Sequence, residues 1–187
     1  WEYCDVSPCS GKELGANEET PTEPPTEPPE TFQTCGQPEV RRTLKKIYGG
    51  SKATAGKHPW MAFLDIHTRD GKEHFCGGVL IKSCWVLTAA HCLEEPVKKI
   101  QVSLGKQNLQ EKEDHEQIFD AVEIILHDKY KDKGDVLYND IALLKLQSVD
   151  GYCAVETKYV KTACLPDFFL PAGTSCFISG WGETETG

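Results

Sequence analysis

The sequence of 187 residues lacks a long apolar run. Because a membrane-spanning helix needs about 18 or more mostly apolar residues, we expect no transmembrane segment. The region after Trp1 also lacks the charged stretch and the apolar core of a secretion signal. We therefore expect any such signal to lie upstream of this chain.

A cluster of basic residues is missing too. The formal net charge is −9, and residues 1–34, with eight acidic residues and one lysine, carry seven of these nine negative charges. The rest of the chain is close to neutral. Proteins that bind nucleic acids usually carry a clustered excess of lysine and arginine, so we expect no nucleic-acid partner.

The short spacings of metal-binding motifs are also absent. The nine cysteines include no C-x2-C pair, and the six histidines form no H-x-x-x-H or H-E-x-x-H pair. We therefore expect no metal site and no cofactor. Disulfides explain the cysteines better, which indicates an extracellular or secretory compartment. Because nine is an odd number, at least one cysteine lacks a partner here or pairs with another molecule.

Residues 10–34 have the composition of a linker, with Glu, Thr and Pro densest in TPTEPPTEPPE (21–31). Almost no aliphatic residue is available to bury, so we expect a disordered, semi-stiff spacer of the polyproline II type. Its threonines could carry O-linked sugars, although a plain solvated linker is the simpler interpretation.

After Lys46 the sequence changes to short apolar or alternating runs separated by turn residues. These runs are MAFLDIH (61–67), GGVLI (77–81), WVLTAA (85–90), KIQVSL (99–104), AVEIILH (121–127), DIALLKL (140–146) and TSCFISGW (174–181). We predict strands here, and hence an all-β barrel or sandwich. A helix is the alternative for AVEIILH, but its β-branched residues and the turn KDKGD that follows favour a strand.

Several motifs occur together in one order. They are IYGG (47–50) after two lysines, CGGVLI (76–81), WVLTAAHC (85–92), NDIALLKL (139–146) and ISGWG (178–182). Each is weak alone, since a histidine after a strand and Asn-Asp before a strand are common structural features. Together they resemble the chymotrypsin-like family of serine proteases, which includes trypsin. The resemblance implies the first six-stranded antiparallel barrel of the family's double barrel and the start of the second.

The resemblance also implies roles for single residues. His91 would be the general base and acid, and Asp140 the buried carboxylate that orients its imidazole ring. Cleavage between Lys46 and Ile47 would free an α-amino group at Ile47 and activate a zymogen. A basic linker before a strand is the other interpretation of this cleavage site.

The family pattern further implies three disulfides. They would join Cys76 to Cys92, Cys84 to Cys153 as in the plasminogen-activator-like subset, and Cys35 to Cys164, which would hold the pro-region after cleavage. Cys4, Cys9 and Cys176 would be unpaired here, because the partner of Cys176 lies in the second barrel of the family. WEYCDVSPC (1–9) resembles the end of a kringle, whose last cysteines bond to earlier ones.

The expected domain organisation follows from these similarities. It comprises a kringle remnant at 1–9, the linker at 10–34, a pro-region with the activation site at 35–46 and an incomplete protease domain at 47–187. Segments such as TAGKHPW (54–60) and KYVKTACLP (158–166) narrow the resemblance to hyaluronan-binding plasma proteases of the family.

That narrower resemblance implies a secreted plasma enzyme that cleaves after Arg or Lys in coagulation, fibrinolysis and matrix proteolysis. Its partners would be protein substrates and protease inhibitors. Heparin or hyaluronan would bind through upstream modules, although Lys98, Lys99 and the basic residues of 41–46 could contribute. Scattered lysines are normal on a solvated face, so we favour the upstream modules.

The sequence departs from the family pattern in two respects. Lys106 stands where trypsins carry a calcium-binding glutamate, so we expect it to face Glu116 across the loop and expect no calcium to bind. The GDSGG-type segment that carries the nucleophilic serine does not occur in the 187 residues. We expect the chain to end before that serine and to be inactive as given. The alternative is a non-enzymatic, protease-like binding protein or an inactive splice isoform.

Overall fold

The computed structural model describes residues 32, 34–40 and 53–182. Several residues that the sequence singles out lie outside this part: Cys4, Cys9, Lys46 and Ile47. The same holds for the expected kringle remnant at 1–9 and for most of the expected linker at 10–34. The fold below is that of the described residues.

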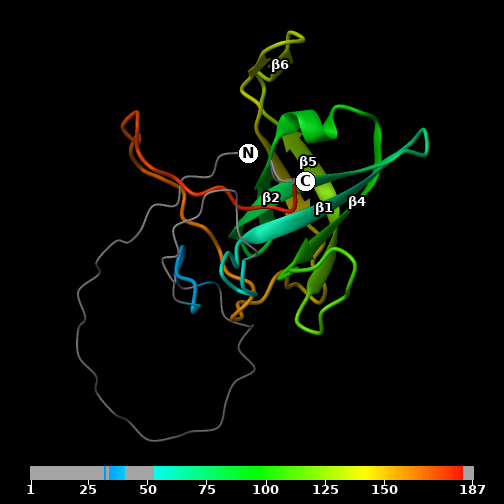
Figure 1. Ribbon diagram of the computed structural model, residues 1–187. Helices are drawn as coiled ribbons and strands as arrows, with labels where there is room; N and C mark the ends of the chain where they lie inside the picture. The colour runs from blue at the N-terminus through cyan, green and yellow to red at the C-terminus, as the bar shows by residue number, and fades with distance from the viewer. Residues whose placement is uncertain (1–31, 33, 41–52, 183–187) are drawn as a thin grey trace, which may run out of the picture.

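Six antiparallel strands close into a barrel (Figure 1). In chain order they are β1 (Met61–Thr68), β2 (Glu73–Lys82), β3 (Trp85–Thr88), β4 (Val97–Leu104), β5 (Gln117–Leu126) and β8 (Ala142–Leu146). Around the barrel their order is β1-β2-β3-β8-β5-β4, so β1 and β4 pair to complete the ring. The expected all-β fold with a first six-stranded barrel is confirmed.

Alternate residues of the strands fill the barrel. On β1 and β4, Ala62, Leu64 and Ile66 stand opposite Leu104, Val102 and Ile100 in the register, and all six side chains are at most 2% exposed. Leu144 and Leu146 of β8 join the same core. Side chains two residues apart on a strand share a face, which explains why the alternating runs of the sequence became the walls of a closed core.

Gly78 of β2 shows how tightly this core is packed. A Cβ placed on Gly78 would lie 2.7 Å from Val86 Cγ1 and 3.1 Å from the carbonyl oxygen of Leu87. Both atoms belong to the neighbouring strand β3, so β2 and β3 approach more closely than a larger residue allows. The second glycine of CGGVLI therefore has a packing role.

Two short elements extend from one end of the barrel. A 3₁₀ turn, η1 (Ala90–Leu93), follows β3, and a two-stranded hairpin formed by β6 (Lys131–Asp132) and β7 (Leu137–Tyr138) lies between β5 and β8. Figure 1 shows this hairpin projecting beyond the barrel at the end where η1 lies. The sequence had not indicated β6 and β7.

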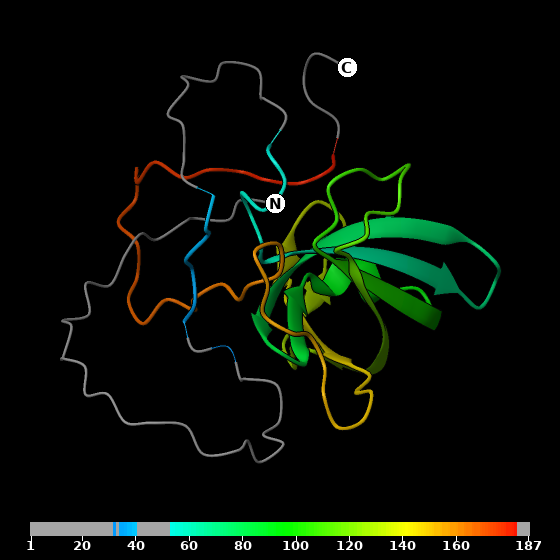
Figure 2. The same cartoon turned by 90° about the horizontal axis from the view of Figure 1, so that it is seen from below.

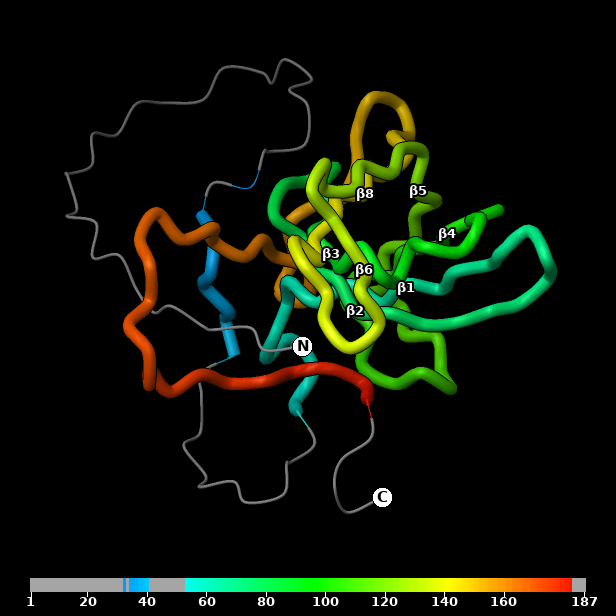
Figure 3. Tube along the Cα trace, turned by 90° about the horizontal axis from the view of Figure 1, so that it is seen from above, coloured from blue at the N-terminus to red at the C-terminus, as the bar shows by residue number. Residues whose placement is uncertain are grey.

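The prediction of a strand at AVEIILH is confirmed, since these residues belong to β5 except for His127. The prediction of a strand at TSCFISGW (174–181) is wrong, because no strand is present there in the described structure. Its apolar residues Phe177 and Ile178 are 50% and 67% exposed. A strand needs a neighbour for its backbone hydrogen bonds, and this segment runs outside the barrel, where Figures 2 and 3 show it in orange to red.

Candidate active site

His91 stands on the turn that ends strand β3. Ala89 keeps an extended backbone (φ −91°, ψ 148°), and the 3₁₀ turn begins at Ala90. Cys92, the next residue, is 2% exposed and bonded to Cys76 of β2, whereas the His91 side chain is 37% exposed. The disulfide thus fixes the backbone while the imidazole ring reaches the surface.

Asp140 enters the site from a backbone conformation that few residues adopt. Asn139, directly before it, has φ of 52°, in the left-handed region that asparagine tolerates better than most side chains. The Asn139 side chain donates from Nδ2 to the carbonyl oxygen of Lys129 at 2.8 Å. This turn leads into β8 and aims the carboxylate of Asp140 back toward η1.

Strand pairing explains why the two side chains meet. β3 and β8 are antiparallel neighbours, and Thr88, the last residue of β3, stands opposite Ala142, the first residue of β8. The residues just after β3 and just before β8 therefore lie at the same end of the barrel. Residues 49 positions apart in the sequence come into direct contact.

The carboxylate of Asp140 makes two hydrogen bonds to one residue. Oδ2 lies 2.7 Å from His91 Nδ1, and Oδ1 accepts the backbone N–H of His91 at 2.9 Å. A carboxylate accepts hydrogen bonds, so Nδ1 carries the proton and Nε2 becomes the basic nitrogen of the neutral ring. The arrangement fixes both the tautomer and the orientation of His91.

The pKa of Asp140 is lowered from its ordinary value. Burial by itself would raise this pKa, but the hydrogen bonds from the His91 ring and backbone, the positive charge that His91 can carry and the Ala90 backbone N–H outweigh it. The carboxylate therefore stays ionised beside the imidazole. An ionised carboxylate is what stabilises the imidazolium that forms when the ring accepts a proton.

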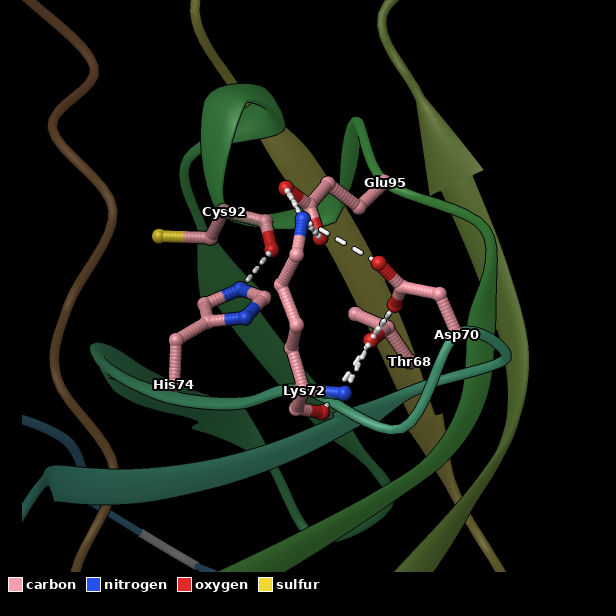
Figure 4. A network of polar contacts seen from close by, with 6 residues as sticks. All are labelled: Thr68, Asp70, Lys72, His74, Cys92 and Glu95. Atoms are coloured by element: carbon pink, nitrogen blue, oxygen red, sulfur yellow. Dashed lines mark hydrogen bonds and ion pairs between the residues drawn. The ribbon is translucent and has the colours of Figure 1, made fainter.

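The β1–β2 hairpin holds the histidine turn from one side (Figure 4). His74 Nε2 lies 2.8 Å from the carbonyl oxygen of Cys92, which can only accept, so Nε2 donates. In the same hairpin, Lys72 Nζ lies 3.1 Å from both Glu95 Oε1 and Asp70 Oδ2. These contacts tie the hairpin to the residues on both sides of the end of η1.

Tyr130 holds the turn from the other side. Its hydroxyl donates a hydrogen bond to the carboxylate of Glu94, directly after η1. Tyr130 follows Lys129, whose carbonyl accepts from Asn139, so one short segment supports both the histidine turn and the approach to Asp140. The sequence motifs did not reveal His74 or Tyr130, and they gave Asn139 no role of its own. Only the position of Asn139 directly before the aspartate was a possible signal.

Comparison with known proteins shows the family of this chain. The family model described as Trypsin matches residues 47–187. The chain belongs to the trypsin family of serine proteases.

Its relatives within this family include plasminogen activators. Tissue-type plasminogen activator of Mus musculus is 39% identical over 191 residues, which cover 99% of this chain and 30% of that protein. Urokinase-type plasminogen activator of Gallus gallus is 42% identical over 162 residues, covering 82% of this chain and 37% of that protein. The chain thus spans about a third of the length of these relatives.

A solved structure described as "Structure of GrC" has a TM-score of 0.63 and 34% sequence identity to this chain. The match covers 73% of this trypsin-family chain and 57% of the other. Among the described residues, no helix has the length and apolar character that crossing a membrane requires.

The structure of this trypsin-family chain forms three disulfides that the family pattern implied. They join Cys76 to Cys92, Cys84 to Cys153 and Cys35 to Cys164. Cys76, Cys92 and His91 also lie close enough together to suggest a metal site. However, the two sulfurs are bonded to each other and offer no thiolate ligand.

Cys176 differs from the expectation. We expected it to be unpaired in this chain, but it is disulfide-bonded in the structure. The expectation rested on the family's pairing pattern alone. The segment around Cys176 belongs to no strand, so no backbone hydrogen bonds of a sheet restrict the position from which Cys176 forms its disulfide.

The loop between β4 and β5 contains the ion pair that the sequence predicted. Lys106 Nζ lies 2.8 Å from Glu116 Oε1, and the two side chains are 11% and 1% exposed. Lys106 also donates to the carbonyl oxygen of Glu111 at 3.1 Å. A cation therefore occupies the place where the trypsin pattern has a calcium-binding glutamate.

The lowered pKa of Asp140 predicts a loss of stability in acid. A carboxyl whose folded-state pKa lies below its unfolded value stabilises the fold above the unfolded value, near 4, and this contribution disappears as the pH falls through the folded value. We expect the difference in free energy of unfolding between the wild type and Asp140→Asn to shrink below about pH 4. Chemical denaturation at a series of pH values measures it. A difference that grows toward acid would contradict the assignment.

Proposed function

We propose that this chain supplies the base and its orienting carboxylate for a secreted, trypsin-like serine endopeptidase that is made as a zymogen. The observation that carries the proposal is the pair of hydrogen bonds from His91 to Asp140, through Nδ1 and through the backbone N–H. Membership of the trypsin family supports it. His91 is the general base and acid, and Asp140 fixes its tautomer.

The chemistry follows from this geometry. A serine hydroxyl is a weak nucleophile until a base takes its proton, and His91 Nε2 is the nitrogen that the Asp140 contact leaves basic. The same nitrogen, once protonated, returns the proton to the leaving amine, while the ionised Asp140 stabilises the imidazolium. We further propose that the nucleophilic serine belongs to a part of the protein outside these 187 residues, and that the chain alone does not hydrolyse peptides.

The substrate class is proteins cut after arginine or lysine. The family description Trypsin and the relatives named plasminogen activators support this assignment. We further propose that cleavage between Lys46 and Ile47 activates the zymogen, and that the enzyme works in coagulation, fibrinolysis and matrix proteolysis. Protein substrates and protease inhibitors are its partners, and heparin or hyaluronan would bind through other modules.

We propose that the protein is secreted into plasma. The three disulfides among the described cysteines support an oxidising compartment outside the cytosol. Two of them hold the ends of β3. Cys84, bonded to Cys153, directly precedes this strand, and Cys92, bonded to Cys76, lies in η1 after it.

The test uses the complete protein after activation, with an arginyl peptide as substrate. His91→Ala is expected to abolish cleavage, because no other group takes the serine proton. His67→Ala removes a histidine of β1 whose ring contacts Asp65 and Glu73, outside the proposed triad, and serves as the control that keeps activity. Full activity of His91→Ala would reject the assignment, and an inactive wild type with a normal fold would favour a protease-like binding protein.

A further inference from the structure

Residues 34–40 of the N-terminal segment lie against residues 161–164, far along the chain. We propose that this segment remains docked on the strip 161–163 through non-covalent contacts, with Lys161 as the deciding residue, after the chain is cut between residues 40 and 47. The inference rests on the proposed activation cleavage for its biological role. It goes beyond the Cys35–Cys164 disulfide, since it assigns the docking to contacts that do not need that bond.

The backbone groups of residues 161–163, the strip, make hydrogen bonds on two opposite sides. Lys161 donates its N–H to the carbonyl of Pro59 at 2.9 Å, and Ala163 donates to that of Leu80 at 2.9 Å. Thr162, between them, faces the other direction and accepts the N–H of Gly36 at 2.8 Å. This alternation is that of a β-strand, whose successive N–H and C=O groups point to opposite sides.

The segment thus adds itself to the strip as a strand would. Cys35 and Thr162 form a parallel bridge, and the Thr162 hydroxyl contacts the carbonyl oxygen of Thr34 at 3.5 Å. Thr162 is only 3% exposed, so its polar groups depend on these partners rather than on water. Addition of an extended segment to an exposed edge gives affinity through main-chain hydrogen bonds.

Gly36 allows the close approach. Its φ of +64° lies in the left-handed region, and a Cβ there would lie 3.0 Å from Cys164 Sγ. A larger residue would be strained in this conformation and would press against the neighbouring sulfur. A glycine at position 36 therefore allows the contact with the strip that the structure shows.

Lys161 provides the charge that selects the segment. Its side chain is 11% exposed, and Nζ lies 2.8 Å from Glu156 Oε1 and 3.2 Å from Glu39 Oε1. Burial alone would lower the pKa of Lys161, but the two carboxylates raise it, so the ammonium stays charged. Departure of the segment would remove Glu39 and leave Lys161 with one carboxylate, that of Glu156.

Apolar contacts extend the docked segment at both ends. Phe32 is partly buried and packs against the main core of the barrel. At the other end, Val40 Cγ2 lies 3.3 Å from the position that a Cβ on Gly56 would take. All these contacts come from residues 32–40, before the proposed cleavage site, so cutting the chain there breaks none of them.

The experiment separates the two kinds of attachment. Cys35→Ser, Cys164→Ser and Cys176→Ser together remove every disulfide that could join the N-terminal fragment to the rest of the chain, since Cys176 is also disulfide-bonded. Residues 41–46 are replaced by the recognition sequence of an unrelated site-specific protease. After the cut, we expect the N-terminal fragment to stay with the barrel in size-exclusion chromatography and native mass spectrometry. Because the cut does not depend on Lys46, a failure of the proposed activation site would not affect this result.

Charge variants then test Lys161 in the same background. Lys161→Met is expected to raise the dissociation constant of the fragment about twofold to fivefold, because Glu39, whose side chain is 57% exposed, loses its ion pair. Glu39→Lys is expected to do the same and changes only the segment, so it cannot unfold the barrel. Lys158→Met alters an exposed lysine three residues away that lies over the Tyr159 ring, and should leave binding unchanged.

Two results would overturn the proposal. One is separation of the fragment as soon as the chain is cut in the variant that lacks Cys35, Cys164 and Cys176. The other is unchanged binding in both Lys161→Met and Glu39→Lys, which would show that Lys161 does not decide the docking.

Discussion

Replacing Asp140 by asparagine is expected to lower kcat of the activated, complete protein about 10⁴-fold, the loss that the same change causes in other serine protease triads. The shape of the side chain is kept and only its charge and donor pattern change. An asparagine amide can donate to His91 Nδ1, where the carboxylate could only accept. The imidazole would then carry its proton on Nε2, and that nitrogen could no longer take the proton of a serine hydroxyl.

The split between kinetic constants distinguishes this effect from loss of substrate binding. The contact of Asp140 is with His91, not with a substrate, so KM should change little while kcat and kcat/KM fall together. A second readout is the tautomer itself, seen in the ¹⁵N chemical shifts of the His91 ring. We expect the proton to move from Nδ1 in the wild type to Nε2 in Asp140→Asn.

Asp120→Asn is the matched control. Asp120 lies on β5, 3.0 Å from Lys99, and both side chains are more than 40% exposed. The substitution makes the same chemical change outside the site. Because surface substitutions usually change the free energy of unfolding by about 0.5 kcal/mol or less, the fold should be kept and the activity should stay within twofold of the wild type. Activity of Asp140→Asn within tenfold of the wild type would show that the carboxylate does not orient the base.

The sequence predicted the barrel well because each strand carries its own pattern. The residues of MAFLDIH alternate between core and surface on β1, and the apolar side chains that the pattern assigns to the inside are buried. TSCFISGW has a similar local pattern but no neighbouring strand, so it formed none. Local propensity indicates a strand only where another strand supplies hydrogen bonds.

The site could be predicted only in part, namely where a local sequence pattern marks the residue. His91 and Asp140 are recognisable because each sits in a motif, WVLTAAHC and NDIALLKL. Other groups that hold them lie in no motif: His74 donates to the backbone carbonyl of Cys92, and Tyr130 to the carboxylate of Glu94. Such contacts depend on how the chain returns to the same end of the barrel, which residue identities alone do not state.

Breaking the Lys106–Glu116 pair is expected to destabilise the fold by about 3–5 kcal/mol, as for other buried ion pairs that lose one partner. Glu116→Gln keeps the size of the side chain but removes the carboxylate that contacts Lys106, which is 11% exposed in the loop between β4 and β5 and keeps only the weaker attraction of Glu113. Glu116 Oε1 also accepts the N–H of Glu113 at 3.3 Å, and a glutamine oxygen can keep that bond. The expected loss therefore comes from the broken ion pair between Lys106 and Glu116.

The double variant Lys106→Met with Glu116→Gln tests this explanation. It removes both charges, so it should recover most of the stability lost in the single variant, since replacing a whole buried pair is often close to neutral. Lys112→Met, an exposed change in the same loop, should stay within about 0.5 kcal/mol of the wild type. Thermal unfolding of all four proteins measures the differences, and a double variant as unstable as the single one would contradict the role of the charge.

Calcium gives a second test of the same loop. Lys106 Nζ places a positive charge beside Glu116, and a cation at that position opposes a divalent metal, so calcium should not raise the melting temperature of the wild type. Lys106→Glu replaces the ammonium by a carboxylate that faces Glu116, and calcium prefers such oxygen ligands. We expect calcium to stabilise Lys106→Glu against heat and magnesium to do so less. Equal responses of the wild type and Lys106→Glu to calcium would show that Lys106 does not exclude the metal.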